Sequence, residues 1–136
     1  MKPLFYFSIL GIVISVQALS QKKSIVLVND ALKNQSIQNI QAKYPLYKDV
    51  ALQIWNYAEM GYKEEKSSAL LQKTLQDNGF NVKPNIAGMP TAFVASYGSG
   101  SPIIAILAEF DALPGLSQDS VPFQKALIAG KAGHGC

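Results

Sequence analysis

The sequence has only one cysteine and one histidine in 136 residues. A single cysteine excludes an internal disulfide, so in an exported chain this thiol would be either reactive or a metal ligand. The formal net charge is only +3, and no basic stripe with interleaved aromatic residues occurs, so a nucleic-acid partner has little support. The sequence also lacks a Gly-x-Ser-x-Gly elbow and a Gly-Lys-Ser/Thr phosphate loop. These absences argue against a serine hydrolase and against a P-loop nucleotide-binding protein.

A long apolar run is missing as well. The longest uncharged, mostly apolar stretch near the N-terminus is Leu4 to Val16, 13 residues, whereas a membrane span needs about 20. Lys2 precedes this run, and Ala18-Leu19-Ser20 follows it with a small residue suited to cleavage. The pattern predicts a signal peptide over residues 1–20 and a secreted or periplasmic protein that is not held at a membrane after cleavage. An uncleaved anchor is the alternative.

The mature chain would begin at Gln21. Residues 21–35 are expected to form a leader or linker, although Ser24 to Val28 could also pass for a strand. From about Ser36 the apolar residues recur at helical spacing until Pro45 interrupts them.

Two helices are then predicted. Leu46, Val50 and Ile54 lie on one face of the first, which we expect to end at Gly61. The second helix begins near Glu64 and Glu65, whose charges favour a helix N-terminus, and buries Leu71 and Leu75. Asn78-Gly79 is its stop signal, with Gly79 in the left-handed conformation and Phe80 packed on Leu75.

Three strands are expected after the helices: Phe80 to Lys83, Thr91 to Tyr97 and Ile103 to Ala108. The five residues Gly98 to Pro102 are interpreted as the turn of a hairpin between the last two strands. The run Ile103 to Ala108 has no polar alternation, so both its faces should be covered, most simply by the two helices. The sequence therefore predicts a single α/β domain in which two helices pack on a hairpin-containing sheet.

Four side chains that could take part in catalysis or bind a metal lie after the last predicted strand. Glu109 and Asp111 are two residues apart and would share a face if the strand continued, although one could instead cap the strand while the other faces solvent. His134 and Cys136 are also two apart, and imidazole and thiolate suit zinc and similar metals. Two such ligands do not make a metal site, so a loop without function remains open on these residues alone.

Four segments resemble, in order, motifs of the zinc- or manganese-dependent aminoacylase and carboxypeptidase superfamily, whose most similar branch contains amino-acid-conjugate amidohydrolases and p-aminobenzoyl-glutamate hydrolases. These segments are Ala58-Glu59-Met60-Gly61-Tyr62-Lys63-Glu64, Ala87-Gly88-Met89-Pro90-Thr91-Ala92, Ala108-Glu109-Phe110-Asp111-Ala112-Leu113-Pro114 and Gly133-His134-Gly135-Cys136. The last two segments are fairly specific in this order and at this separation, and the first two are weak by themselves. Leu107 stands where many relatives carry arginine, which weakly favours the p-aminobenzoyl-glutamate branch.

The resemblance implies that Cys136 is a metal ligand and that Asp111 orients the metal site. Glu109 and His134 would lie near this site without a ligand role. It also implies that residues 36–136 are the N-terminal part of a mixed-sheet metallohydrolase catalytic domain, and that this part is incomplete, because the family's further ligands and its general base lie beyond this cysteine.

The longer protein would be a secreted amidohydrolase, or metallopeptidase, that uses two divalent cations, zinc or manganese. Its substrate would be a small N-acyl amino acid, of the aminobenzoyl type, or a dipeptide, and a homodimer is left open. The chain of 136 residues by itself is expected to hold no metal pair and to be inactive.

Two other interpretations compete with this one. The chain could be a short, non-catalytic, secreted α/β binding or interaction protein with its thiol exposed. A thiol nucleophile that uses Cys136 with His134 is weaker, because side chains two residues apart in a loop rarely reach nucleophile–base geometry.

Overall fold

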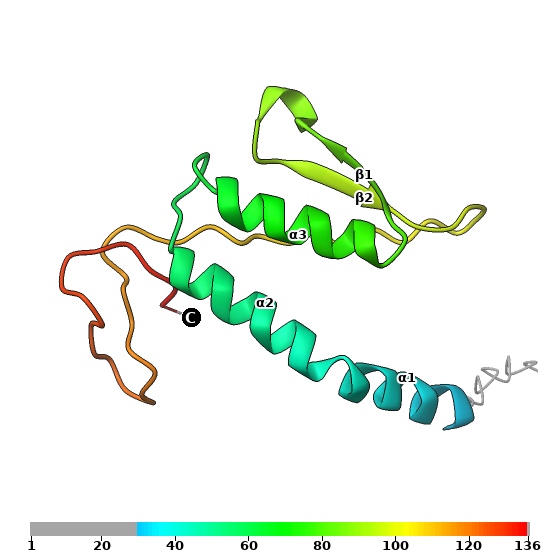
Figure 1. Cartoon of the computed structure of the whole chain (residues 1–136), viewed down its shortest axis with the longest axis horizontal. Coiled ribbons are helices and arrows are strands. Elements are labelled where there is room, and N and C mark those ends of the chain that lie inside the picture. The colour runs from blue at the N-terminus through cyan, green and yellow to red at the C-terminus, as the bar shows by residue number, and fades with distance from the viewer. Residues whose placement is uncertain (1–29, 136) are drawn as a thin grey trace, which may run out of the picture.

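The computed structural model describes residues 30–135. The predicted signal peptide, the possible strand Ser24 to Val28 and Cys136 lie outside the described residues. Within them the chain forms three helices and a two-stranded antiparallel sheet, an incomplete α/β arrangement as predicted (Figure 1). The elements are α1 (Asp30–Ala42), α2 (Tyr44–Tyr57), α3 (Glu65–Asp77), β1 (Asn81–Pro84), η1 (Ile86–Gly88) and β2 (Phe93–Ser96).

The first two helices form a long arm that is broken at one residue. Lys43 separates α1 from α2 with φ −93° and ψ 0°, and Pro45 lies in the first turn of α2. Proline is tolerated there because the amide it lacks would have no partner within the helix. The predicted break between two helices is confirmed, but it lies at Lys43, two residues before Pro45. The helix before it begins at Asp30, earlier than the expected Ser36, because helix-forming residues and an acidic first turn extend it.

The predicted end of α2 at Gly61 is wrong. The helix ends at Tyr57, and Ala58 takes the left-handed conformation (φ 47°, ψ 42°) while its amide donates to Ile54 O at 3.2 Å. The left-handed conformation is sterically unfavourable for alanine, so the residue type at this position carries no stop signal. The consequence is that Glu59 and Gly61 lie in a tight connection between α2 and α3 rather than in the helix.

The end of α3 agrees with the prediction. Gly79 has φ +87°, its amide donates to Gln76 O at 2.9 Å, and the amide of Phe80 donates to Leu75 O at 3.0 Å. These two bonds form a Schellman motif, in which a residue without a side chain takes the left-handed position. The ring of Phe80 lies 5.2 Å from that of Tyr97, centroid to centroid, so the helix end is joined to the end of the sheet.

The predicted pairing of Thr91–Tyr97 with Ile103–Ala108 in a hairpin is wrong. β2 pairs instead with β1, in antiparallel register from Asn81 opposite Ser96 to Pro84 opposite Phe93. The link between them contains η1, which begins after Asn85 in the left-handed conformation. α3 contacts both strands and therefore covers this hairpin (Figure 1).

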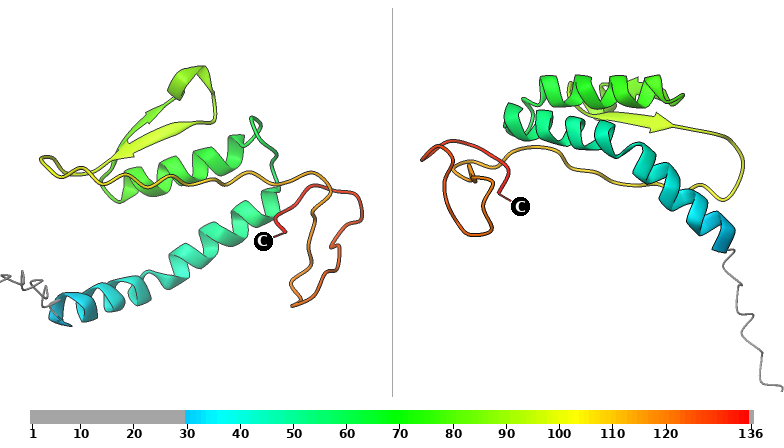
Figure 2. Two further views of the ribbon diagram at one scale, coloured as in Figure 1. Left: turned by 180° about the vertical axis from the view of Figure 1, so that it is seen from behind. Right: turned by 60° about the horizontal axis from the view of Figure 1, so that its bottom comes forward.

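The run from Ile103 to Ala108 is not a strand in this structure and is not covered. Ile103, Ile104, Ile106 and Leu107 are 84–91% exposed, and the segment runs as an extended trace in both views of Figure 2. Neighbouring helices contact each other and α3 contacts the β1–β2 hairpin, whereas no element among residues 30–135 covers this segment. Ala112 is the only buried hydrophobic residue in the described part of the chain. In that part no helix is long and apolar enough to cross a membrane.

Candidate functional site

Asp111 follows the exposed run at the point where the chain returns to the body of the protein. On one side of it, the ring of Phe110 packs on Phe93 of β2 with centroids 6.2 Å apart. On the other side, the amide of Ala112 donates to the backbone oxygen of Glu59 at 2.7 Å, and Ala112 forms a parallel bridge with Met60. Asp111 is therefore half-buried and is held through both of its neighbours.

The carboxylates of Asp111 and Glu64 face the same glycine. A methyl group placed on Gly61 would lie 3.5 Å from Asp111 Oδ2 and 3.9 Å from Glu64 Oε1. Glu64 is buried, and its other oxygen, Oε2, accepts a hydrogen bond of 2.7 Å from the hydroxyl of Thr91. The hydroxyl of Ser68 in turn donates to Thr91 O at 2.7 Å. These bonds place the Thr91 segment against the start of α3, and the other Glu64 oxygen lies near Gly61, as Asp111 Oδ2 does.

Glu59 caps the start of α3 from the preceding connection. Its carboxylate accepts hydrogen bonds from the Lys66 amide (3.0 Å), the Ser67 amide (2.8 Å) and the Ser67 hydroxyl (2.8 Å). Burial alone would raise the pKa of Glu59. The bonds from the Ser67 and Lys66 amides and the Ser67 hydroxyl, together with the Lys66 charge, outweigh this effect and hold the pKa below its usual value of 4.5. The bonded carboxylate is therefore ionised at neutral pH.

The segments that carry Asp111 and His134 lie side by side. Leu113 and Gly133 form an antiparallel bridge, with the Leu113 amide 3.0 Å from Gly133 O and the Gly133 amide 3.1 Å from Leu113 O. A Cβ atom at position 133 would lie 2.5 Å from Ser117 Cα, so only glycine fits there. The bridge brings together two motifs that are far apart in the sequence, as the resemblance implies.

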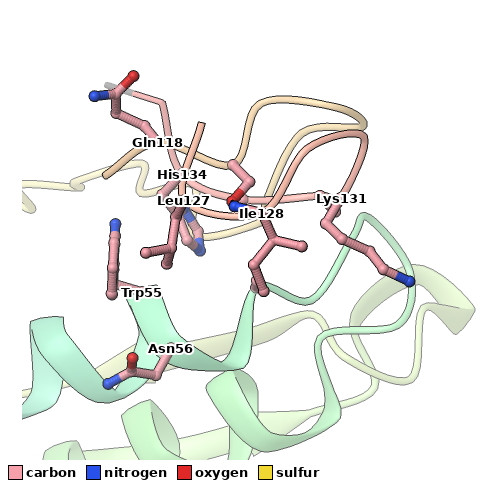
Figure 3. A pocket seen from close by; sticks show the side chains of 11 residues that line it. Trp55, Asn56, Gln118, Leu127, Ile128, Lys131 and His134 are labelled. Carbon is pink, nitrogen blue, oxygen red and sulfur yellow. The ribbon is translucent and has the colours of Figure 1, made fainter. Parts of the chain in front are cut away.

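His134 lines a small cavity between the end of α2 and the C-terminal loops (Figure 3). Trp55 lies on the helix side, with Leu127 and Ile128 on the loop side, and the space is about 100 Å³. His134 Nε2 is buried and has no hydrogen-bond partner among the described residues.

The structure brings together some of the predicted site residues but not all of them. Glu109 is exposed and lies on the far side of Phe110 from the bridge, whereas Asp111 and His134 lie beside it. Cys136 is outside the described residues. Within residues 30–135 no group of three or more His, Cys, Asp or Glu side chains could hold a metal ion. The described side chains therefore do not by themselves fit a metal pair.

The sequence assigned no part in the site to Glu59, Glu64 or Thr91, although all three lie in the two weaker motif segments and Glu64 was expected at the start of a helix. The structure gives them one: they bond the first segment to α3 and to the second segment. The sequence feature that pointed to these three residues was the order of the motifs along the chain, because neither segment indicates a chemical function when it is considered alone. Together with the contacts of Ala112 and Leu113, these bonds join all four motif segments into one connected unit.

Comparisons with known proteins agree with this arrangement of motifs. No family model matches the chain. Over 98 residues, 71% of its length, the chain is 43% identical to a p-aminobenzoyl-glutamate hydrolase polypeptide of Escherichia coli (strain K12), and the match spans 20% of that protein. The chain thus corresponds to about a fifth of the relative. At this level of identity, the chain belongs to the amidohydrolase family that includes the E. coli p-aminobenzoyl-glutamate hydrolase.

Proposed function

We propose that this chain is part of a hydrolase that cleaves the amide bond of a small N-acyl amino acid of the p-aminobenzoyl-glutamate type. The observation that carries the proposal is the connection of four motif segments around Asp111, by the Glu64–Thr91 bond, the Ala112–Glu59 bond and the Leu113–Gly133 bridge. The activity for which the E. coli relative is named supports the substrate class. A dipeptide is the other member of this class, because it presents the same amide next to a carboxylate.

Asp111 is the residue to which we assign a direct part in the site. Its carboxylate is held between Phe93 and Glu59 through its two neighbours and lies beside Gly61, which Glu64 Oε1 also approaches. A carboxylate fixed in this way can orient a reacting group without the entropy cost of ordering it during each turnover. His134 lies next to this region and supports the loop from within its cavity.

We further propose that the catalytic cations, two zinc or manganese ions, are held by a longer enzyme and not by this chain alone. Asp111, His134 and Cys136 supply too few groups for two ions, and in the described part of the chain no cluster of three candidate ligands exists. The purified mature chain, mixed with zinc or manganese, should hydrolyse neither p-aminobenzoyl-glutamate nor N-acetyl amino acids. Metal-dependent turnover by this polypeptide would contradict the assignment.

Export is a separate proposal, supported by Lys2, the apolar run Leu4 to Val16 and the small residue at Ser20. N-terminal sequencing of protein recovered outside the cytoplasm should begin at or near Gln21. Recovery of an intact Met1 from that compartment would refute cleavage.

The activity can be tested in a chimera in which the matching residues of this chain replace their counterparts in the E. coli relative. We expect the chimera to release p-aminobenzoate from p-aminobenzoyl-glutamate and the Asp111→Asn chimera to be strongly impaired. A folded chimera without activity, beside an active E. coli parent, would reject the proposed function and favour a non-catalytic binding protein.

A further inference from the structure

Glu59 contacts both the start of α3 and the segment of Asp111. Its side chain accepts the Lys66 and Ser67 amides and the Ser67 hydroxyl at 2.8–3.0 Å. Its backbone oxygen accepts the amide of Ala112 at 2.7 Å. The same residue therefore fixes its own backbone to α3 and presents that backbone to the residue after Asp111.

The side-chain bonds decide where the Glu59 backbone lies. The first amides of a helix have no partner within it, and Glu64 at the N-cap position of α3 makes no side-chain cap bond. Glu59 supplies the missing acceptor, and its negative charge is favoured at the positive end of the helix. Ser67 is 1% exposed, so water cannot readily replace Glu59 as the partner of this residue.

We infer that Glu59 is a positioning residue for Asp111, acting through the bond from the Ala112 amide to the Glu59 backbone oxygen. The inference rests on the proposed function in so far as Asp111 is a site residue. Ala112 is 1% exposed, and the hydrogen bond from its amide to Glu59 O is short, so a shift of the Glu59 backbone is transmitted to the Asp111 segment. The other side of Asp111 is fixed by the packing of Phe110 on Phe93, so the bond to Glu59 is one of two contacts that fix the position of Asp111.

Burial would raise the pKa of Glu59, but the hydrogen bonds from Ser67 and Lys66, with a smaller effect of the Lys66 charge, lower it and so set the direction of its pH dependence. Lys66 on α3 lies near enough to favour the ionised form, and Glu64 and Asp111 are the other carboxylates around this connection. The pKa of Glu59 is lower in the folded protein than its usual 4.5. The stabilisation is therefore fully present above about pH 4.5 and is lost as the pH falls through the lowered pKa.

The first test uses this chain and measures hydrogen exchange of the Ala112 amide by NMR. Glu59→Gln keeps the shape of the side chain but loses the charge, and its amide nitrogen cannot accept a bond from Lys66. We expect the protection of Ala112 to fall roughly tenfold, as for the loss of a helix cap, and more in Glu59→Ala. Glu65→Gln, an exposed carboxylate in the first turn of α3, is the matched control and should leave Ala112 unchanged.

The pH profile separates positioning from a general loss of structure. In the unsubstituted chain and in Glu65→Gln, protection of Ala112 should decline below about pH 4.5, whereas Glu59→Gln should start lower and lack this step. Glu64 and Asp111 are present in all three proteins, so their titration cannot cause the difference. Unchanged protection and an unchanged profile in Glu59→Gln would overturn the inference, whatever the catalytic activity of the protein.

The second test measures kcat and KM in the chimera with the E. coli relative. Because a displaced site residue slows the reaction rather than substrate binding, Glu59→Gln should lower kcat by roughly 10- to 100-fold and leave KM nearly unchanged. Glu65→Gln should keep both constants. An active chimera in which Glu59→Gln has no effect rejects the positioning role. An inactive chimera rejects the proposed function, and the exchange experiment then decides the structural part of the inference.

Discussion

Replacing Gly133 with alanine should separate the segments that carry Asp111 and His134. The new Cβ would lie 2.5 Å from Ser117 Cα, 3.0 Å from Ser117 N and 3.1 Å from Leu116 O. All three are backbone atoms, so no side-chain rotation can make room. Overpacking of this kind typically costs about 1–3 kcal/mol.

The displaced backbone would also lose its pairing with Leu113. The bridge contains two hydrogen bonds, of 3.0 and 3.1 Å, and each contributes about 1 kcal/mol net. The summed cost is about 3–5 kcal/mol, a large part of the stability of about 5–15 kcal/mol that is typical of a domain. We therefore expect Gly133→Ala to lower the hydrogen-exchange protection of the Leu113 amide by about tenfold or more, as measured by NMR.

Gly61→Ala is the matched control. Gly61 belongs to the same network, but a Cβ there would meet only side-chain oxygens, of Asp111 at 3.5 Å and of Glu64 at 3.9 Å, which is ordinary contact. It should leave the Leu113 amide as protected as in the unsubstituted chain. The reasoning would be refuted if Gly133→Ala kept full protection of Leu113, or if both alanines reduced it equally.

Other parts of the structure can be tested in the same way. Gly79→Ala should lower the free energy of unfolding by about 1 kcal/mol or more, measured by thermal denaturation, because alanine resists the φ of +87° at the end of α3. Ile104 and Ile106 are 84% and 90% exposed, and replacing both with lysine should raise the monomer fraction in size-exclusion chromatography, because charge blocks pairing between unpaired apolar segments. Unchanged association would show that this run does not mediate self-association. In the chimera, Asp111→Asn should reduce kcat roughly 10- to 100-fold while Glu109→Gln has a milder effect, and the reverse order would exchange the roles of the two carboxylates.

Local sequence signals predicted the helices well. Pro45 predicted a break between two helical segments, and Gly79 the left-handed position past the end of α3, because each residue has a strong conformational preference of its own. The end of α2 at Ala58 could not be predicted in this way. Alanine has no preference for the left-handed conformation, and the structure imposes it to direct Glu59 towards α3.

Strand pairing was less predictable than strand content. The segments of β1 and β2 were both expected, but β2 was assigned to the wrong neighbour, Ile103 to Ala108. Extended segments with similar composition compete for the same edge, and their own residues do not specify which one pairs. The apolar run was expected to be a covered strand, but in residues 30–135 it is exposed and no element packs over it.

The sequence by itself determined the composition of the candidate site and its order along the chain, including the carboxylate of Asp111 and the imidazole of His134. It did so because motif order and residue chemistry are properties of the chain before it folds. Only the tertiary structure decided that Glu59 caps α3 and holds Ala112, that Thr91 bonds Glu64, and that Leu113 pairs with Gly133. These contacts join residues far apart in the sequence, and their bond partners are specified by the path of the backbone through space rather than by the preference of any single residue.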